Sequence, residues 1–344
     1  MRVNRVLLVG SSYSHTVNYY NLIKDKVADI FLFTDNKTDK IPSKAFDFSL
    51  TNFLSIPKRI KQLRKEIKEY HPDIIHIHQA NAYAFFAIKA SKGLNIPIIT
   101  TLWGSDVLLM PKRNFILRKM FQYIIENSQL LTADATILKD EAIKYTSKKL
   151  DVTIVNYGIE FLPIPIEKEN LIYSNRLHYS IYNIDRIIKD FAKFNLENKF
   201  KLIVGAVGED TEKLKNMTSQ LNGKENVTFC GWLTKEDNIA NYAKSKIYVS
   251  IPDSDGTAIS LLEAMYYECL PIVSDLPANR EWIEDGKNGI IISSADKNIF
   301  EKINQIDIAS AITFNKELIK EKGNKATNRA VFLSLYEKLI QQND

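Results

Sequence analysis

The sequence predicts an α/β protein built from two Rossmann-like, doubly wound domains. The chain has 344 residues, which is enough for two domains with a core each. In both halves, short apolar runs alternate with helical runs, as expected for parallel strands that helices cover on both faces. Pro163 and Pro165 interrupt this alternation and mark residues 160–168 as the linker. The expected domains are residues 1–162, residues 163–325 and a C-terminal helix over residues 326–344 that packs back on the first domain.

Composition limits the class of protein further. About 45% of the residues are apolar and 25% are charged, which is ordinary for a soluble globular chain. No apolar run approaches the ~20 residues of a membrane span, and residues 1–10 hold too short an apolar core for a signal peptide, so we expect a cytoplasmic protein. Cys230 and Cys269 stand beside apolar runs. We expect both in the core, without a disulfide or a cysteine metal site.

The first half begins with a strand, a turn and a helix. Val6–Gly10 is a short apolar run that ends in glycine, and a helical run follows from Thr16. This junction lacks the G-x-G-x-x-G fingerprint, so nothing indicates a nicotinamide cofactor. The other elements expected in this half are strands at Ile30–Phe33, Asp73–Ile77, Ile96–Thr101 and Asp151–Val155, and helices at Pro57–Tyr70 and Ala82–Ala90.

Two histidines stand at the end of one predicted strand. His76 and His78 are two positions apart, and we expect them to point to opposite faces of the sheet, an arrangement poorly suited to holding one metal ion. Open α/β sheets bind ligands at the carboxyl ends of their strands. His78 is therefore a candidate for contact with a substrate. The alternative is a hydrogen-bonded histidine beneath a loop.

The most informative stretch of the second half joins a strand, Lys246–Ile251, to an apolar helix through a turn at residues 252–258. Such a junction gathers unpaired N–H groups and the positive end of the helix dipole, which suits an anion or a hydroxyl-rich ligand, and Gly256 permits close approach. Asp255 lies in the turn, and Glu263 lies about two turns inside the helix. The alternative is structural, with Asp255 serving the turn and Glu263 a capping box that starts at Ser260. The other elements expected here are strands at Leu171–Leu177, Lys201–Gly205 and Val227–Gly231, and a final helix at Ala326–Ile340.

This stretch resembles the donor-sugar motif of the retaining glycosyltransferases of family 4. The two acidic residues of that motif are likewise separated by seven positions, although the first is usually Glu where this chain has Asp255. The resemblance implies a GT-B fold, in which two facing domains hold the active site in the cleft between them. It also implies that a sugar passes, with retention, from a nucleotide-sugar held by the second domain to an acceptor met by the first, in surface-glycan assembly. The resemblance continues through Asn226–Trp232, Ala264–Met265, Pro271–Val273, Asn279–Trp282 and Asp285–Gly289.

The resemblance implies roles for individual residues. Asp255 would contact hydroxyls of the donor sugar, and Glu263 would contact those of the ribose. Arg176 would hold the donor pyrophosphate, for which a guanidinium fork is well suited, and would stabilise the departing phosphate together with the N–H groups at the start of the helix. The expected catalytic residues are Asp255, Arg176 and His78. The expected donor-binding residues are Gly231, Trp232, Gly256, Thr257, Ala258, Ile259 and Glu263.

The chain departs from the family pattern at two positions. Tyr182 stands where the family usually has a second phosphate-binding Lys, for which His178 is a poor substitute, and Trp103 replaces the His of a His-Gly pair. The identity of a general base is therefore open. Two other functions also stay open, namely a GT-B sugar-nucleotide epimerase and a non-catalytic sugar-nucleotide-binding subunit. The expected acceptor-side residues are Gly10, Ser11, His15, Trp103, Gly104 and Asp106.

We predict neither a metal nor another cofactor. Asp253-Ser254-Asp255 formally matches a metal-binding Asp-x-Asp, but it belongs to the carboxylate motif already described. The first 150 residues carry 23 Lys and Arg against 13 Asp and Glu, a net +10, and the remainder carries 23 against 28, a net −5. This asymmetry indicates different partners for the two halves.

The basic residues of the first half concentrate in residues 58–68 and 112–119. We expect these segments to make weak, salt-sensitive contact with an anionic membrane that carries a lipid-linked acceptor. The alternatives are a solvated helix face and a soluble glycan acceptor. Nucleic acid is not expected as a partner, because no aromatic residues are interleaved with the basic ones in the manner of a stacking groove.

Overall fold

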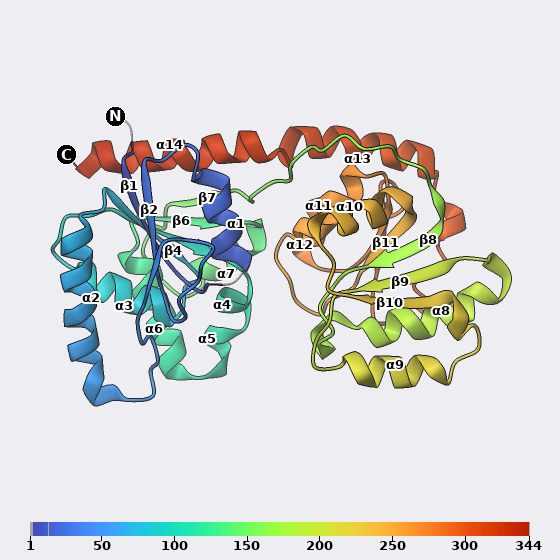
Figure 1. The fold of residues 1–344 in the computed structure, drawn as a ribbon, viewed down its shortest axis with the longest axis horizontal. Helices are drawn as coiled ribbons and strands as arrows, with labels where there is room; N and C mark the ends of the chain where they lie inside the picture. The colour runs from blue at the N-terminus through green and yellow to red at the C-terminus, as the bar shows by residue number, and fades with distance from the viewer. Residues whose placement is uncertain (1–2, 13, 344) are drawn as a thin grey trace. The chain divides into compact units, whose positions relative to one another are not determined.

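The computed structural model describes residues 3–12 and 14–343. Its contacts divide the chain into two compact units (Figure 1). Unit 1 comprises Met1–Tyr157 and Lys325–Asp344, and unit 2 comprises Gly158–Asn324. The last helix of the chain therefore belongs to the same unit as the first strand. Each unit holds one wholly parallel sheet, so the predicted pair of doubly wound α/β domains is confirmed.

Unit 1 contains a seven-stranded sheet with the order β3-β2-β1-β4-β5-β6-β7. The central strands β1, β4, β5 and β6 are buried along nearly their whole length, because helices cover both faces of the sheet. The strands are β1 Arg5–Val9, β2 Asp29–Thr34, β3 Ser43–Ala45, β4 Ile74–His78, β5 Ile98–Leu102, β6 Leu130–Ala133 and β7 Val152–Ile154.

The helices of unit 1 form two layers on this sheet. Helix α3 packs between α2 and α6, and α1 contacts α14. Right-handed crossovers place α1 on the face opposite to α2, α3 and α6, because the strand order reverses between β1 and β4. Each crossover helix runs antiparallel to the strands, so the N-termini of α2, α3 and α6 lie at the carboxyl edge of the sheet. The helices are α1 Ser14–Ile23, α2 Ile56–Tyr70, α3 Ala82–Ser91, α4 Ser105–Leu108, α5 Met110–Arg113, α6 Phe115–Asn127, α7 Thr136–Ile143 and α14 Lys325–Asn343.

Buried polar contacts fasten α14 to the centre of unit 1. The hydroxyl of Tyr336 lies 2.8 Å from the hydroxyl of Tyr19 on α1 and 2.7 Å from Nδ1 of His76 on β4. Asn328 Nδ2 donates to Oδ1 of Asn156 at 2.9 Å. These groups are buried, so each contact replaces a hydrogen bond to water that the folded chain cannot make.

Unit 2 contains a six-stranded sheet with the order β10-β9-β8-β11-β12-β13. One apolar cluster fills the face under α8 and α9, and two others lie on the opposite face around α10, α11 and α13. The strands are β8 Glu169–Ser174, β9 Lys201–Gly205, β10 Val227–Gly231, β11 Ser245–Ser250, β12 Leu270–Ser274 and β13 Ile290–Ile292. The helices are α8 Ile184–Asn198, α9 Thr211–Ser219, α10 Lys235–Lys244, α11 Ile259–Tyr266, α12 Pro277–Arg280 and α13 Ile308–Lys322.

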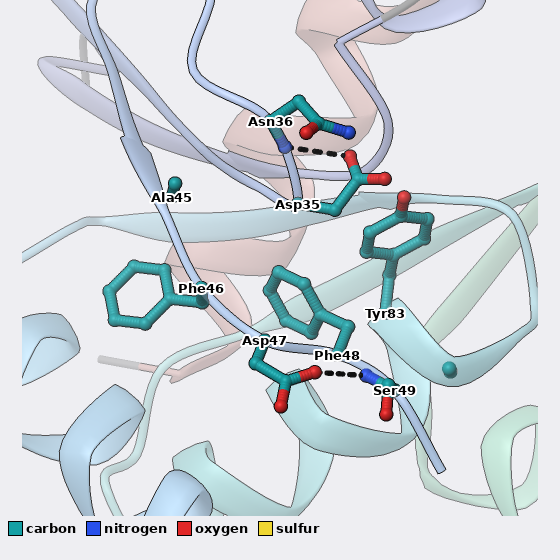
Figure 2. Close-up of a pocket in the computed structure, with 9 residues that line it drawn as sticks. Asp35, Asn36, Ala45, Phe46, Asp47, Phe48, Ser49 and Tyr83 are labelled. Carbon is teal, nitrogen blue, oxygen red and sulfur yellow. Dashed lines mark hydrogen bonds between the residues drawn. The ribbon is translucent and has the colours of Figure 1, made fainter. Parts of the chain in front are cut away.

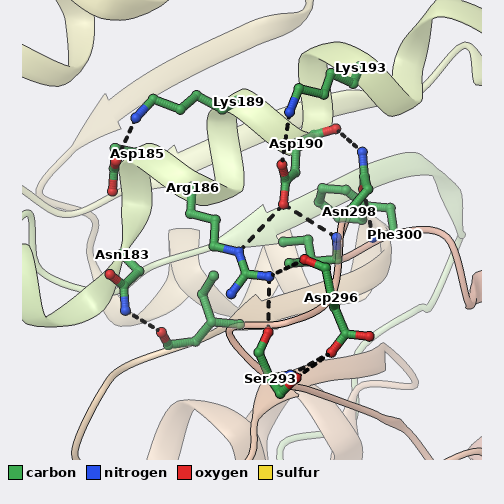
Figure 3. Close-up of polar contacts among 12 residues, drawn as sticks. Asn183, Asp185, Arg186, Lys189, Asp190, Lys193, Ser293, Asp296, Asn298 and Phe300 are labelled. Atoms are coloured by element: carbon green, nitrogen blue, oxygen red, sulfur yellow. Dashed lines mark hydrogen bonds and ion pairs between the residues drawn. The ribbon is translucent and has the colours of Figure 1, made fainter.

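Helix α8 also fixes the loop that follows β13 (Figure 3). Arg186 donates to the carbonyls of Ser293 at 3.0 Å and Asp296 at 2.9 Å, and it lies 3.6 Å from the carboxylate of Asp190. The carbonyl of Asp190 accepts a hydrogen bond from Asn298 at 2.9 Å. Main-chain carbonyls of this loop thus accept hydrogen bonds from α8. These contacts stabilise the loop although it forms no regular secondary structure here.

Only one of the two cysteines of the described chain lies in the core. Cys269 is buried as expected, but Cys230 is exposed, so its placement in the core was wrong. Cys230 lies on the edge strand β10, where Val227 and Phe229 pack against the core and the alternate residues, Cys230 among them, point to the opposite face and are exposed. The short strands β3 and β13 and the helices α6 and α13 were not anticipated.

Candidate functional site

The turn between β11 and α11 is held by side chains from two other segments of unit 2. Asn183 donates to the carbonyl of Ile251 at 3.0 Å and to Oδ1 of Asp253 at 2.8 Å. Ser274, at the end of β12, donates to the carbonyl of Pro252 at 2.7 Å. Asn183 has a positive φ of 53°, a conformation that asparagine tolerates better than most residues. The turn is therefore preorganised by neighbours that sequence analysis did not identify.

Arg176 follows β8 and reaches the start of α11. Its Nη2 lies 2.6 Å from Oδ2 of Asp255, and its Nη1 donates to Oγ of Ser260 at 3.3 Å. The guanidinium also lies over the ring of Tyr182, 4.5 Å from its centroid. Burial acts against the charged form, but the carboxylate of Asp255 and nearby tyrosines outweigh it, so the pKa of Arg176 is raised above its ordinary value. The structure thus brings two of the predicted catalytic residues into direct contact.

A chain of hydrogen bonds continues from Ser260 into unit 2. The hydroxyl of Tyr248 donates to Oγ of Ser260 at 2.8 Å and lies 3.1 Å from Oδ1 of Asn175. Asn175 Nδ2 donates to the hydroxyl oxygen of Tyr242 at 2.8 Å, and the Tyr242 hydroxyl bonds in turn to Glu263. This network links the ion pair to the second predicted carboxylate. The tyrosines lie in an ordinary strand and helix pattern, so the sequence offered no signal for their role.

Glu263 is half-buried on α11. Burial raises the pKa of its carboxyl, and the hydrogen bond from Tyr242 offsets part of that rise. Helix α11 begins at Ile259 with Ala258 as its N-cap residue, so Ser260 is already the second residue of the helix. The capping-box alternative for Glu263 was therefore wrong, and its carboxylate is directed into the tyrosine network.

The other predicted donor-binding residues lie at the same helix start or at the end of β10. Gly256, Thr257 and Ala258 are buried, and Ile259 is half-buried. Gly231 ends β10, and Trp232 after it is 71% exposed, which leaves a large flat face of the indole open. Whether these residues contact a donor stays a prediction.

His178 does not supply a second cation to this site. Its Nδ1 lies 2.9 Å from Oγ1 of Thr211, and its Nε2 lies 3.1 Å from the carbonyl of Gly205. Burial lowers the pKa of His178. The ring is thus a neutral, hydrogen-bonded part of the scaffold, in keeping with its expected unsuitability as a phosphate ligand.

The predicted acceptor-side residues of unit 1 lie at the carboxyl edge of the seven-stranded sheet. Gly10 ends β1, and a Cβ at this position would lie 2.9 Å from Oγ1 of Thr16 and 3.1 Å from Cβ of His78. Glycine is therefore required for α1 to pack against β4. Ser11 follows in the same loop and is half-buried.

An aromatic stack occupies the same edge of unit 1. The ring of His15 is stacked on Trp103 with 4.5 Å between centroids, and Trp103 lies 4.6 Å from Tyr157. Tyr157 donates its hydroxyl proton to the carbonyl of His15 at 3.0 Å. His15 is exposed and Trp103 is half-buried, so both reach the surface. Tyr157 is a member of this group that sequence analysis missed.

The two strand-end histidines lie on the same face of the sheet. Their rings are stacked with 4.5 Å between centroids, because residues two apart on a strand point to the same side, and the expectation of opposite faces was wrong. His76 lies 2.6 Å from Oγ1 of Thr101 and bonds to α14, whereas His78 is 1% exposed between His76 and Trp103. Burial lowers the pKa of both rings. Contact between His78 and an acceptor stays a prediction that this enclosure does not favour.

Asp106 ties two loops of this edge together. Its Oδ2 accepts from the N–H of Ala80 at 2.7 Å, and its Oδ1 accepts from the N–H of Trp103 at 3.0 Å. Burial raises the pKa of this carboxyl although the backbone hydrogen bonds act to lower it. Gly104, with a φ of 118° that side chains rarely adopt, makes the bend before α4. The side chain of Asp106 is 3% exposed, so it supports the loops beneath the surface.

Two arginines of the predicted basic helix face inward. Arg59 donates to the carbonyls of Asp47, Ser49 and Asn52 at 2.6 to 3.1 Å. Arg64 donates to the carbonyl of Ala90, in the last turn of α3, at 2.8 Å and to the carbonyl of Lys92, the C-cap of α3, at 2.7 Å. These two arginines are therefore engaged within unit 1, and contact of this helix with a membrane stays a prediction. The exposed cations of α2 are Lys58, Lys61, Lys65 and Lys68, and Lys65 lies 3.5 Å from Glu69.

Residues 3–12 and 14–343 contain no helix long and apolar enough to cross a bilayer. The same described residues contain no group of three or more His, Cys, Asp and Glu side chains arranged to hold a metal ion. Both oxygens of Asp255 have partners, since Oδ1 accepts from the N–H of Gly256 at 3.1 Å and Oδ2 pairs with Arg176.

Comparisons with known proteins agree with this architecture. A family described as glycosyl transferases group 1 matches residues 159–327, and a family described as glycosyl transferase 4-like matches residues 5–135. The chain is 22% identical over 274 residues to alpha-monoglucosyldiacylglycerol synthase of Streptococcus pneumoniae, an alignment that covers 69% of this chain and only 61% of that protein.

Two solved structures show the same fold. The Anabaena protein HepE in complex with UDP aligns with a TM-score of 0.78 at 12% identity and covers 97% of this chain and 100% of its own. Sucrose-phosphate synthase of Thermosynechococcus elongatus aligns with a TM-score of 0.81 at 12% identity, over 98% of this chain and 100% of its own. The two matched families span most of both units and agree with the motif order of the sequence. The chain therefore belongs to the group 1, family 4 glycosyltransferases and has their GT-B fold.

Proposed function

We propose that this protein transfers a sugar from a nucleotide-sugar donor to a hydroxyl group of a glycan or glycolipid acceptor, with retention of the anomeric configuration. The observation that carries the proposal is the contact of Arg176 with Asp255 at the start of α11, with Glu263 joined to the same hydrogen-bond network. A cation, a turn carboxylate and a helix N-terminus together suit a ligand that has both a diphosphate and sugar hydroxyls.

We assign a separate role in the proposed reaction to each of Arg176, Asp255 and Glu263. Arg176 has further N–H donors beyond those on Asp255 and Ser260, and these would hold the diphosphate while Asp255 accepts hydrogen bonds from hydroxyls of the sugar. In the reaction the bond between the anomeric carbon and the diphosphate oxygen breaks, and the acceptor oxygen forms the new bond while its proton is released. The negative charge that develops on the leaving diphosphate would be stabilised by Arg176 and by the start of α11. Glu263 would accept hydrogen bonds from the ribose.

A uridine nucleotide is the donor we favour. HepE of Anabaena has been solved with UDP and with UDP-glucose, and its fold matches this chain over nearly its whole length. The exposed indole of Trp232 offers a flat apolar face next to Gly231, where the family resemblance places the base.

We propose that the transfer needs no divalent metal. Asp253 accepts a hydrogen bond from Asn183, and Asp255 pairs with Arg176, so the formal Asp-x-Asp motif already has partners in the protein. Arg176 then supplies the positive charge that a metal would otherwise bring to the diphosphate. Activity in excess EDTA tests this part of the proposal.

We further propose that unit 1 touches an anionic membrane when the acceptor is lipid-linked. Phe53 and Leu54, just before α2, are 68% and 95% exposed, and Phe115 and Ile116, at the start of α6, are 69% and 68% exposed. Both pairs lie at the carboxyl edge of the sheet on the same helical layer. Basic side chains flank them, with Lys58 following the first pair and Lys112, Arg113 and Lys119 around the second. Exposed apolar side chains flanked by cations are typical of segments that lie on a bilayer surface.

The test is a panel of nucleotide sugars incubated with the protein, with and without lipid-linked and free glycan acceptors. The proposal predicts that UDP release and a glycosylated product, identified by mass spectrometry, require an acceptor, and that the product keeps the anomeric configuration of the donor by NMR. Conversion of the donor without any acceptor would instead indicate an epimerase. Donor binding with no conversion under any condition would indicate a non-catalytic subunit.

A further inference from the structure

Unit 1 contains a pocket of about 660 Å³ at the carboxyl edge of its sheet (Figure 2). Its walls come from the loop after β2, with Asp35 and Asn36, and from the segment after β3, with Asp47 and Phe48. Tyr83, in the first turn of α3, completes the lining. The volume falls within the roughly 300–1,000 Å³ typical of small-molecule sites. None of the predicted acceptor-side residues lines this pocket.

The aromatic side of the pocket is part of a packed cluster. The ring of Tyr83 lies 4.9 Å from that of Phe48, and Phe46 lies 4.8 Å from Phe33 of β2. Asn81 accepts from the N–H of Tyr83 at 3.0 Å and so fixes the first turn of α3. Figure 2 shows the hydroxyl end of Tyr83 directed toward Asp35. A fixed aromatic face with a polar tip suits a sugar ring, which presents apolar C–H faces and hydroxyl edges.

The polar side of the pocket carries carboxylates and an amide. Asp35 Oδ1 accepts hydrogen bonds from Oγ1 of Thr34 at 3.1 Å and from the N–H of Asn36 at 3.0 Å, which orients the group. None of the nine described residues that line the pocket is a Lys, Arg or His. Charge-assisted hydrogen bonds from hydroxyl or ammonium donors would be favourable here, whereas a carboxylate or phosphate on the ligand would be repelled.

Arg59 makes the pocket wall rigid. It lies 3.0 Å from the carboxylate of Asp47, donates to three carbonyls of residues 47–52, and stacks over the ring of Phe86 at 5.1 Å. Its side chain is 12% exposed. The segment at residues 47–52 is therefore preorganised, which lowers the entropic cost of binding a ligand.

We propose that this pocket binds a hydroxyl-rich sugar unit of the acceptor that carries no negative charge. The inference rests on the proposed glycosyl transfer and names the acceptor chemistry that the protein selects. The sugar unit belongs either to the headgroup of a glycolipid or to a free glycan. In both cases the pocket recognises the ring and its hydroxyls, and it discriminates against uronic acids and sugar phosphates.

Saturation-transfer NMR on the full-length protein tests this inference. The probes are methyl glucoside, methyl glucosaminide and methyl glucuronide. The first two should receive saturation and the glucuronide should not. Asp35→Lys and Tyr83→Ala should weaken binding roughly 10- to 100-fold, the range expected when a hydrogen bond to a charged group or a stacking surface is lost. Asp39→Lys, an exposed carboxylate of the same loop outside the pocket, is the matched control and should bind as wild type.

Competition separates the two sources of the sugar. Glucosyl-diacylglycerol in detergent micelles should displace methyl glucoside if a glycolipid headgroup fits, and maltotriose should displace it if a free glycan fits. Displacement by neither, saturation of all three glycosides alike, or equal binding by the Asp35 and Asp39 variants would overturn the inference. UDP binding measured by calorimetry on the same variants should be unchanged. If the wild type does not bind UDP, this contradicts the proposed function and leaves the inference about the pocket untouched.

Discussion

The guanidinium of Arg176 lies 2.6 Å from the carboxylate of Asp255, and this contact joins the end of β8 to the start of α11. Arg176 is stacked on Tyr182 where the family pattern has a lysine, so this guanidinium is held between a carboxylate and an aromatic face. The lysine's charge is not replaced by a neighbouring histidine, because His178 is buried and hydrogen-bonded. We therefore expect the site to depend strongly on the guanidinium of Arg176.

Arg176→Ala should reduce kcat roughly 100- to 1,000-fold, with a smaller effect on donor affinity. The reason is that charge on the leaving diphosphate grows in the transition state, where one preorganised donor has its largest effect. Steady-state kinetics and donor calorimetry on the same protein measure the two quantities. Arg280→Ala is the control, since Arg280 forms an exposed pair with Asp275. An unchanged kcat in the Arg176 variant would contradict its catalytic role.

Glu263→Gln should weaken donor binding by about 1.5–3 kcal/mol, because a carboxylate that accepts ribose hydrogen bonds is replaced by an amide. The fold should be retained, and the variant should gain stability relative to wild type as pH rises above 4.5. Burial raises the pKa of Glu263 in the folded state, so ionising it costs folding free energy that the unfolded chain does not incur. Calorimetry and melting curves from pH 4 to 7 test both points. Glu268→Gln, which breaks a pair with Lys316, is the control.

Lowering the pH from 7.5 to 5.5 should destabilise unit 1. Burial lowers the pKa of His76 to about 3, from an ordinary value of 6.5. The unfolded chain therefore binds a proton that the folded chain excludes, and stability falls as pH drops from about 6.5 toward 3, by up to about 1.4 kcal/mol per pH unit for this ring. Thermal unfolding at pH 7.5 and 5.5 measures the effect. A melting temperature that does not fall between these values would contradict a lowered pKa of this buried ring in the folded state.

Removing the exposed apolar residues ahead of α2 should reduce binding to anionic vesicles. The double variant Phe53→Ser with Leu54→Ser loses two side chains that are more than two-thirds exposed, so its stability should change little. Sedimentation with phosphatidylglycerol and phosphatidylcholine vesicles at low salt measures binding. Phe314→Ser, on a 40% exposed residue of unit 2, is the control. Equal recovery of wild type in the supernatants of both vesicle types would contradict a membrane contact.

The sequence carried enough information for the fold and for the donor motif because both depend on local patterns. The strand, turn and helix at residues 246–265 show their periodicity and turn residues directly, and the structure places β11 and α11 there. The network through Tyr248, Asn175 and Tyr242 could not be predicted, since Asn175 is far from the two tyrosines in sequence and each tyrosine looks like an ordinary core residue.

Charge patterns in the sequence proved less reliable than apolar patterns. The basic residues of 58–68 led us to predict contact with an anionic membrane, but Arg59 and Arg64 turn inward to bond main-chain carbonyls. Sequence shows the sign of a side chain but not its partner, and long side chains can reach either way. The pocket at Asp35 and Tyr83 could not be predicted from the sequence either, because its walls come from three segments that lie together only in the folded protein.

Product formation by wild type and by Asp255→Asn tests the central claim most directly. The measurement is mass spectrometry of the acceptor after incubation with UDP-sugar, in parallel with Asp275→Asn, an exposed carboxylate of the same unit that pairs with Arg280. We expect glycosylated acceptor from wild type and from the Asp275 variant, and at least a 100-fold loss from the Asp255 variant, in which the partner of Arg176 and of the donor hydroxyls has lost its charge. Equal product from both variants, or no product from wild type with any donor and acceptor, would contradict the account.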